Sequence, residues 1–210
     1  MATVREIYQY LDGLAPFSLQ MDFDNAGFLV GRGDRQVKKL LVALDITQEV
    51  AEEAVELGAE LIVSHHPVIF HPAKSVTDGD PDGRILLTLI EGGVAAICAH
   101  TNLDAVTGGV NDALAQALGL TQIEQLHQDG VDPAGRPYGI GRVGAVAGAP
   151  KYAPEFAAFV REALGANLID AGHYPTEQVV VPVLAKWLSA GFPQVEVAET
   201  ARHKEAFLYG

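Results

Sequence analysis

The chain is predicted to be an α/β protein in which helices flank a mostly parallel sheet. Three short apolar runs, at residues 39–44, 61–64 and 94–99, have the pattern of strands buried on both faces. Amphipathic segments separate these runs, and each segment ends at or near glycine. Because strands that alternate with helices form parallel sheets through right-handed crossovers, this order favours one sheet covered by helices.

Helices account for the segments before and between these strands. Residues 4–14 have helical spacing and stop at Ala15-Pro16, and Thr47 is a suitable N-cap for a helix that ends at Gly58. Two further helices are expected over residues 84–90 and 111–118, because glycines follow both of them.

The second half of the chain has a different texture. Residues 121–137 are polar and turn-rich, which we interpret as a domain boundary or a long loop. Pro182 predicts a kink or an early break in the last helix. We divide the chain into an α/β lobe at residues 1–125 and a second α/β lobe at residues 126–210. Beyond the turn-rich segment we expect a strand at 140–146, a helix at 154–164, a strand at 168–171, a helix from about Pro175 and a strand at 195–198.

Composition excludes several classes of protein. The net charge is −13, and the 14 Lys and Arg residues are scattered, which disfavours nucleic-acid binding. No apolar stretch approaches the roughly 18 residues of a membrane span, and the N-terminus does not have the pattern of a secretion signal. The single cysteine, Cys98, is expected to be a buried apolar residue. We therefore expect a cytoplasmic protein.

His65 and His66 directly follow the apolar run at 61–64 and are the most informative residues. Imidazole is the commonest metal-ligating side chain. Neighbouring residues on extended backbone point to opposite sides, so the pair could offer one ligand to each of two ions. Two further segments follow strand-like runs and carry a histidine with a carboxylate four residues later: His100 with Asp104, and His173 with Glu177.

These segments together predict a dinuclear metal site, because ligands gather at the carboxyl ends of parallel strands. Two divalent ions would lower the pKa of a bridging water from about 15.7 toward 7 and so provide hydroxide at neutral pH. Mixed nitrogen and oxygen ligation suits Zn, Mn, Fe, Co or Ni. His100 is expected beside the site, as an outer residue or a sixth ligand. The predicted ligands are His65, His66, Asp104, His173 and Glu177.

Two other motifs have simpler interpretations. Residues 139–144 match G-x-G-x-x-G by letters, but they lie in a strand-like stretch where no helix opens, so we reject a dinucleotide site. Residues 22–27 form a polar turn that could reach the metal site, although a simple turn is the favoured interpretation.

The motifs in order are DNAGFLVG at 24–31, SHHPVIF at 64–70, HTNLDA at 100–105, GIGRVG at 139–144, and Gly172-His173 with Glu177. This series resembles the GTP cyclohydrolase 1 type 2 homologue family, also described as Nif-like, hexameric ring proteins with a dinuclear metal centre. The resemblance implies a two-lobed α/β subunit, a two-metal site on the five predicted ligands, and a homo-hexamer whose sites face an inner cavity. It also implies that water opens the guanine imidazole ring of GTP.

The sequence departs from this family at two places. The C-terminal tail at residues 201–207 differs from the Asp-Pro-Phe-like ending that the family leads us to expect, and the other departure lies before the Gly-His motif. Members usually carry a further segment between a helix like 154–164 and the Gly-His motif. Here Asn167 runs directly into Leu168, so the chain is either shortened at this point or lacks residues between the two.

The leading hypothesis is a cytosolic metal-dependent hydrolase of a nucleotide-like small molecule, in which metal-activated water attacks and Asp104 or Glu177 helps to bridge the ions. His100 is the predicted catalytic residue, as a proton carrier. The two ions would offset the acidity of the chain toward polyanionic GTP, with Lys74 or Arg142 as helpers. The alternative is a ring-forming metal-binding scaffold or regulator without turnover.

Overall fold

The computed structural model describes residues 1–146, 152–164 and 173–202, and the chain divides into two compact units. Of the described residues, the first unit contains 1–103 and 184–202, and the second contains 104–146, 152–164 and 173–183. These units do not coincide with the lobes 1–125 and 126–210, because the C-terminal strand pairs with the sheet of the first unit.

The first unit is built on a five-stranded sheet with the order β11-β4-β5-β6-β2. Pairing is parallel from β11 through β6, and the edge strand β2 runs antiparallel to β6. The predicted mostly parallel α/β sheet is therefore confirmed. Its strands are β2 (Gly27–Val30), β4 (Lys39–Ala43), β5 (Leu61–Ser64), β6 (Ala95–Cys98) and β11 (Glu196–Glu199), and β1 (Ala2–Thr3) pairs with β3 (Gln36–Val37) beside it.

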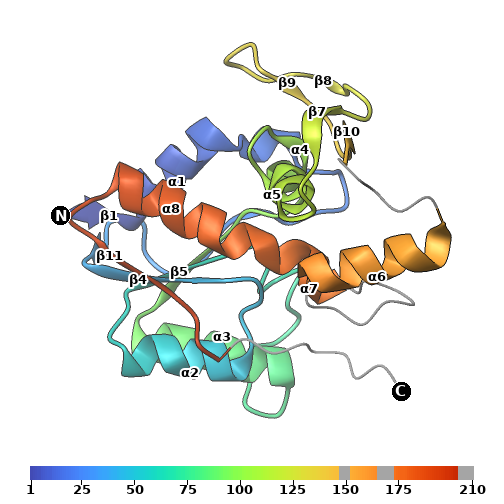
Figure 1. Ribbon diagram of the computed structural model, residues 1–210. Helices are drawn as coiled ribbons and strands as arrows, with labels where there is room; N and C mark the ends of the chain where they lie inside the picture. Colours follow the sequence, from blue (N-terminus) through green and yellow to red (C-terminus); the bar gives the residue numbers. More distant parts are fainter. Residues whose placement is uncertain (147–151, 165–172, 203–210) are drawn as a thin grey trace. The chain divides into compact units, whose positions relative to one another are not determined.

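Helices cover both faces of this sheet (Figure 1). On one face lie α2 (Gln48–Glu56) and α3 (Pro81–Gly92), and on the other lie α1 (Val4–Leu14) and α8 (Val181–Gly191). The central strands β4 and β5 are buried on both sides, as their continuous apolar sequences predict. The short helix η1 (Phe17–Leu19) follows α1.

The ends of these helices follow from local chemistry. The Thr47 hydroxyl accepts a hydrogen bond from the Val50 amide at 3.3 Å, which confirms the predicted N-cap. Helix α3 begins at Pro81, earlier than predicted, because a proline in the first turn loses no helical hydrogen bond. Its end is Gly93 in the left-handed conformation with φ 67°.

The second unit combines helices with two small antiparallel ribbons. Strand β7 (Thr121–Gln125) pairs with β10 (Arg142–Ala145), and β8 (Gly130–Val131) pairs with β9 (Pro137–Tyr138). The interpretation of 121–137 as a long loop was therefore wrong. Short, largely exposed strands bury too little apolar surface to leave a pattern in the sequence.

The predicted helices at 111–118, at 154–164 and from about Pro175 are found in the second unit as α5 (Val110–Ala117), α6 (Ala153–Leu164) and α7 (His173–Glu177), which η2 (Gln178–Val180) follows. The short helix α4 (Thr101–Ala105), where the chain passes from the first unit to the second, was not predicted. The predicted break at Pro182 is confirmed, since η2 interrupts the helix and α8 restarts at Val181. The predicted strand 168–171 and the Asn167–Leu168 junction lie outside the described residues. Within the described ranges, no helix has the length and apolarity that crossing a membrane requires.

Candidate metal centre

Polar side chains lie together at the edge of the five-stranded sheet that is formed by the carboxyl ends of its parallel strands. Asp45, His66 and His100 each lie two residues past the end of a strand, after β4, β5 and β6 respectively. These three strands are parallel neighbours, so their carboxyl ends meet at this edge. Because β2 is antiparallel, its first residue, Gly27, pairs with Cys98 at the end of β6. The turn that contains Asp24 therefore reaches the same edge.

Three histidines come together at this edge. His65, His66 and His100 can each offer a ring nitrogen, and these atoms all lie within 4.8 Å of one another. The ring centroids are 5.0 Å apart for His65–His66, 5.2 Å for His65–His100 and 5.5 Å for His66–His100. Among the described residues, this is the one group of histidine, cysteine or carboxylate side chains with spacing that could hold a metal ion.

The Nδ1 atom of every ring in this cluster is held by an oxygen. His65 Nδ1 lies 2.8 Å from the Ala99 carbonyl oxygen, His66 Nδ1 2.6 Å from Asp45 Oδ1, and His100 Nδ1 2.8 Å from Asp24 Oδ1. A carbonyl or carboxylate oxygen only accepts, so each Nδ1–H donates and the lone pair of the neutral ring lies on Nε2. Paired Nδ1–H donors are the usual arrangement of metal-ligating histidines, so this donor set fits a divalent transition metal.

Asp24 is the most constrained of these acceptors, because its side chain is fully buried. It accepts from His100 Nδ1, from the Thr101 amide at 3.1 Å and from the Thr101 hydroxyl at 2.5 Å. Burial alone would raise the pKa of Asp24, but the hydrogen bonds from Thr101 and His100 outweigh burial and lower this pKa. The ionised carboxylate therefore fixes the tautomer and the orientation of His100.

The side chains of His65 and His66 do not point to opposite sides, as they would on regular extended backbone. The amides of His65 and His66 both donate toward the end of β4, to Ala43 and Leu44 at 3.2 and 2.8 Å. In a regular strand successive amides point to opposite sides, so the chain turns at this dipeptide. As a result both rings reach one small volume together with His100.

The other predicted ligands belong to the second unit. Asp104 lies in α4 and is partly buried, and its backbone carbonyl accepts from Asn111 Nδ2 at 2.9 Å. Glu177 is the partly buried last residue of α7. His173 begins α7, and its side chain lies outside the described residues. Metal ligation by these three residues stays a prediction.

The sequence interpretation gave no role to Asp45 and favoured a simple turn for Asp24. Each carboxylate can be recognised in the sequence only once the order and direction of the strands are known. Asp45 follows β4 by the same two residues that separate His66 from β5. Asp24 becomes visible only when β2 is recognised as an antiparallel edge strand, and β2 has four residues beginning with a glycine.

Arg142 has all its donors engaged, so it is not a helper for phosphate. Its guanidinium makes two hydrogen bonds to Asp112, at 2.7 and 3.0 Å, and three more to the carbonyls of Gly139, Gly141 and Val106. These account for the five N–H donors of an arginine side chain. The glycine motif at 139–144 therefore anchors a strand in the second unit, in agreement with the rejection of a dinucleotide site.

The prediction for Cys98 is confirmed. Cys98 is buried, and burial raises the pKa of its thiol well above the usual value, which leaves an Sγ–H that donates to the His65 carbonyl. The side chain of His127 is 78% exposed and pairs with Asp129 on the surface.

Most of the chain matches the sequence profile of a known protein family. Residues 2–166 match the sequence profile of the family Duf34/NIF3 (NGG1p interacting factor 3). The chain belongs to the Duf34/NIF3 family. This confirms the resemblance that the motifs suggested.

The curated relatives of this Duf34/NIF3 chain bear the name "GTP cyclohydrolase 1 type 2 homolog". The Halalkalibacterium halodurans relative is 43% identical over 126 residues, covering 60% of this chain and 34% of the relative. The Streptomyces coelicolor relative is 41% identical over 143 residues, covering 68% and 50%. The aligned part of the chain thus spans half or less of the length of these two proteins.

Solved structures share the fold of this Duf34/NIF3 chain. The Bacillus cereus protein related to NIF3 superposes with a TM-score of 0.86 at 19% identity and covers 100% of this chain and 99% of that one. Reduced HcgD from Methanocaldococcus jannaschii superposes with a TM-score of 0.76 at 24% identity and covers 95% and 98%. At these identities the likeness establishes the NIF3-like fold alone.

Replacing Asp24 by asparagine is expected to weaken divalent-metal binding about 10–100-fold. The amide has the size of the carboxylate but no charge, and it lacks one of the two oxygens that now accept from His100 and Thr101. The measurement is a competition titration of zinc against a chromophoric chelator. Asp22→Asn is the control, because Asp22 is exposed in the same turn. Equal affinities for the two variants would contradict a role of Asp24 in holding His100.

Proposed function

We propose that the protein is a cytosolic, divalent-metal-dependent hydrolase that acts on a nucleotide-like substrate and resembles GTP cyclohydrolase 1 type 2. The observation that carries this proposal is the cluster of His65, His66 and His100, whose Nδ1 atoms are all held by oxygen acceptors. The name of the curated relatives supports the reaction class.

In this proposal the histidines would hold an ion through Nε2, while Asp24, Asp45 and the Ala99 carbonyl keep His100, His66 and His65 in the required tautomer. When bound, a divalent ion lowers the pKa of water from about 15.7 toward 7, which supplies a nucleophile at neutral pH. The negative charge of the two carboxylates makes the imidazoles of His66 and His100 better ligands.

The finer parts of the proposal rest on the sequence motifs. A second ion would use Asp104, His173 and Glu177, with Asp104 or Glu177 bridging the pair. His100 has the same Nδ1 arrangement as the other two histidines, which supports the role of a ligand over that of the proton carrier. Assembly as a homo-hexamer is part of this proposal and rests on the family resemblance.

The test is formate release from GTP. Water adds to the ring carbon between the two imidazole nitrogens, the ring opens, and a second water releases that carbon as formate. Protein loaded with Zn, Mn, Fe, Co or Ni is expected to release formate in step with the loss of GTP. Asp104→Asn is expected to lower the rate at least about tenfold. Asp129→Asn is the control, because this carboxylate pairs with the exposed His127.

One outcome would count against the hydrolase, and another against the role of Asp104. Absence of formate with all five metals, in protein that binds the metal, would favour the non-catalytic scaffold. Turnover that Asp104→Asn leaves unchanged would remove Asp104 from the proposed site.

A further inference from the structure

A cavity of about 450 Å³ lies in the first unit beside the three-histidine cluster. Residues 67–75, which directly follow His66, form one wall, and residues 80–86 at the start of α3 contribute to the other. Phe70 lines this cavity, and its ring centroid lies 6.3 Å from that of His100. The volume is in the range of small-molecule sites, about 300–1,000 Å³.

Contacts outside the cavity fix both of its walls. Asn25 Nδ2 donates to the Ile69 carbonyl at 2.5 Å, which ties one wall to the turn whose Asp24 holds His100. On the other side, Arg84 donates to the Asp78 carbonyl at 3.1 Å. Gly83 is required there, because a Cβ at this position would lie 2.2 Å from the Thr77 carbonyl oxygen. The cavity is therefore shaped by backbone packing and joined to the histidine cluster.

The lining combines an apolar floor with carboxylates. Val68, Ile69 and Leu86 are apolar, and the Phe70 residue is 39% exposed, which leaves ring surface for stacking. Asp80, Asp82 and Lys74 give the lining a formal charge of −1 with His71 neutral. A polyphosphate would meet net repulsion here, whereas a neutral ring with N–H donors would find acceptors. Within the described residues, Asp80 and Asp82 belong to no group with metal spacing.

We propose that this cavity, which we name the base pocket, binds the heterocyclic base of the substrate. The ligand class is a planar aromatic ring with two adjacent N–H donors on one edge, as in guanine. The ring stacks on Phe70, and Asp80 or Asp82 accepts both donors through its two carboxylate oxygens. This inference rests on the proposed function, because it places the base next to the histidines.

The base pocket predicts that guanine binds more tightly than hypoxanthine, and hypoxanthine more tightly than adenine. Adenine has an acceptor where guanine has the ring N–H, and that acceptor would face a carboxylate. Hypoxanthine retains the ring N–H but lacks the exocyclic amine, so it loses one of the two bonds. A hydrogen bond to a charged group corresponds to a tenfold or larger change in affinity.

The test is binding of nucleosides to the full chain after metal removal by a chelator, measured by calorimetry. Guanosine is expected to bind at least tenfold more tightly than adenosine, with inosine between them. The double variant Asp80→Asn/Asp82→Asn is expected to lose at least tenfold in guanosine affinity. Phe70→Leu is expected to lose several-fold.

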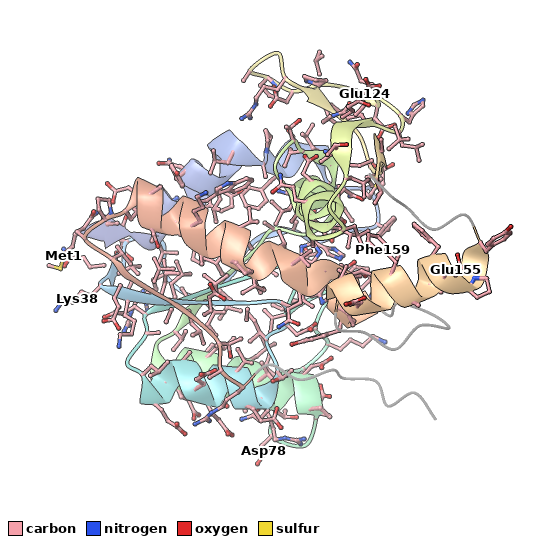
Figure 2. The ribbon with its side chains drawn as sticks, viewed as in Figure 1. Met1, Lys38, Asp78, Glu124, Glu155 and Phe159 are labelled. Atoms are coloured by element: carbon pink, nitrogen blue, oxygen red, sulfur yellow. The ribbon has the colours of Figure 1, made fainter. Side chains whose placement is uncertain are left out.

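Asp78→Asn is the matched control. Figure 2 shows Asp78 at the outer edge of the loop before α3, and this residue does not line the base pocket. Its guanosine affinity is expected to equal that of the unmodified chain. Unchanged circular dichroism and zinc affinity of the double variant would show that its fold and the histidine cluster are intact.

Three results would overturn the base pocket: no guanosine binding at millimolar concentration, equal binding of guanosine and adenosine, or unchanged affinity in both the double variant and Phe70→Leu. This assay contains neither metal nor phosphate. Failure of formate release together with selective guanosine binding would therefore reject the hydrolase and retain the pocket, and the converse pair of results would do the opposite.

Discussion

Replacing His66 and His100 together by alanine is expected to lower the affinity for divalent metal by more than about 100-fold. The double variant removes two of the three imidazoles that lie within 4.8 Å of one another. It leaves His65, which alone offers a single neutral ligand. Both removed side chains are partly exposed, at 18% and 17%, so the fold is expected to tolerate the truncations.

The measurement for this variant is metal content after equilibrium dialysis against buffered zinc or manganese. His127→Ala is the matched control, because His127 also pairs its Nδ1 with an aspartate, but on the surface of the second unit. The control is expected to retain the metal content of the unmodified chain. Full metal content in the double variant would show that the ion is bound elsewhere.

Replacing Arg142 by methionine is expected to destabilise the second unit by about 3–5 kcal/mol. The Arg142 side chain is 4% exposed, and its loss would leave the Asp112 side chain, 12% exposed, without its bidentate partner. Three backbone carbonyls would lose a donor at the same time. A buried charge that loses its partner destabilises a protein far more than the pair stabilises it.

The measurement for Arg142→Met is the midpoint and slope of urea unfolding. Arg136→Met is the control, because Arg136 also pairs with an aspartate, Asp132, but is 43% exposed. Arg136→Met leaves Asp132, whose side chain is 2% exposed, with hydrogen bonds from the backbone amides of Ala134 and Arg136, so a smaller loss of stability is expected. Arg142→Lys is expected to recover only part of the loss, since lysine has three donors and cannot make the planar bidentate pair. Equal midpoints for Arg142→Met and Arg136→Met would contradict the buried anchor.

The sequence predicted the elements whose burial is strong and regular. Strands β4, β5 and β6 are continuous apolar runs, and helices α1, α2 and α6 have clear caps or periodicity, so their positions agree closely with prediction. Pro182 correctly indicated the break before α8. The predicted strand at 140–146 corresponds to β10, but its partner β7 and the ribbon of β8 and β9 were missed, because half-exposed strands of two to five residues carry little hydrophobic signal.

The sequence predicted the histidines of the candidate site, but it did not predict the backbone turn and the carboxylates that hold them in place. His65, His66 and His100 stand out because they follow apolar strands. The convergence of His65 and His66 depends on a backbone turn that extended geometry does not foresee. Asp24 was harder to predict, because its role depends on an antiparallel edge strand paired across 70 residues of chain, from Gly27 to Cys98. Tertiary pairing of this kind leaves no local pattern.

The most direct test of the three-histidine metal centre is X-ray absorption spectroscopy of the zinc-loaded full chain. It is expected to show imidazole nitrogens at about 2.0–2.1 Å from the ion, with the multiple-scattering signature of histidine rings. That signature is expected to diminish in the His66→Ala/His100→Ala variant. A protein that binds no zinc after dialysis, or zinc surrounded by oxygen ligands alone, would contradict the metal centre.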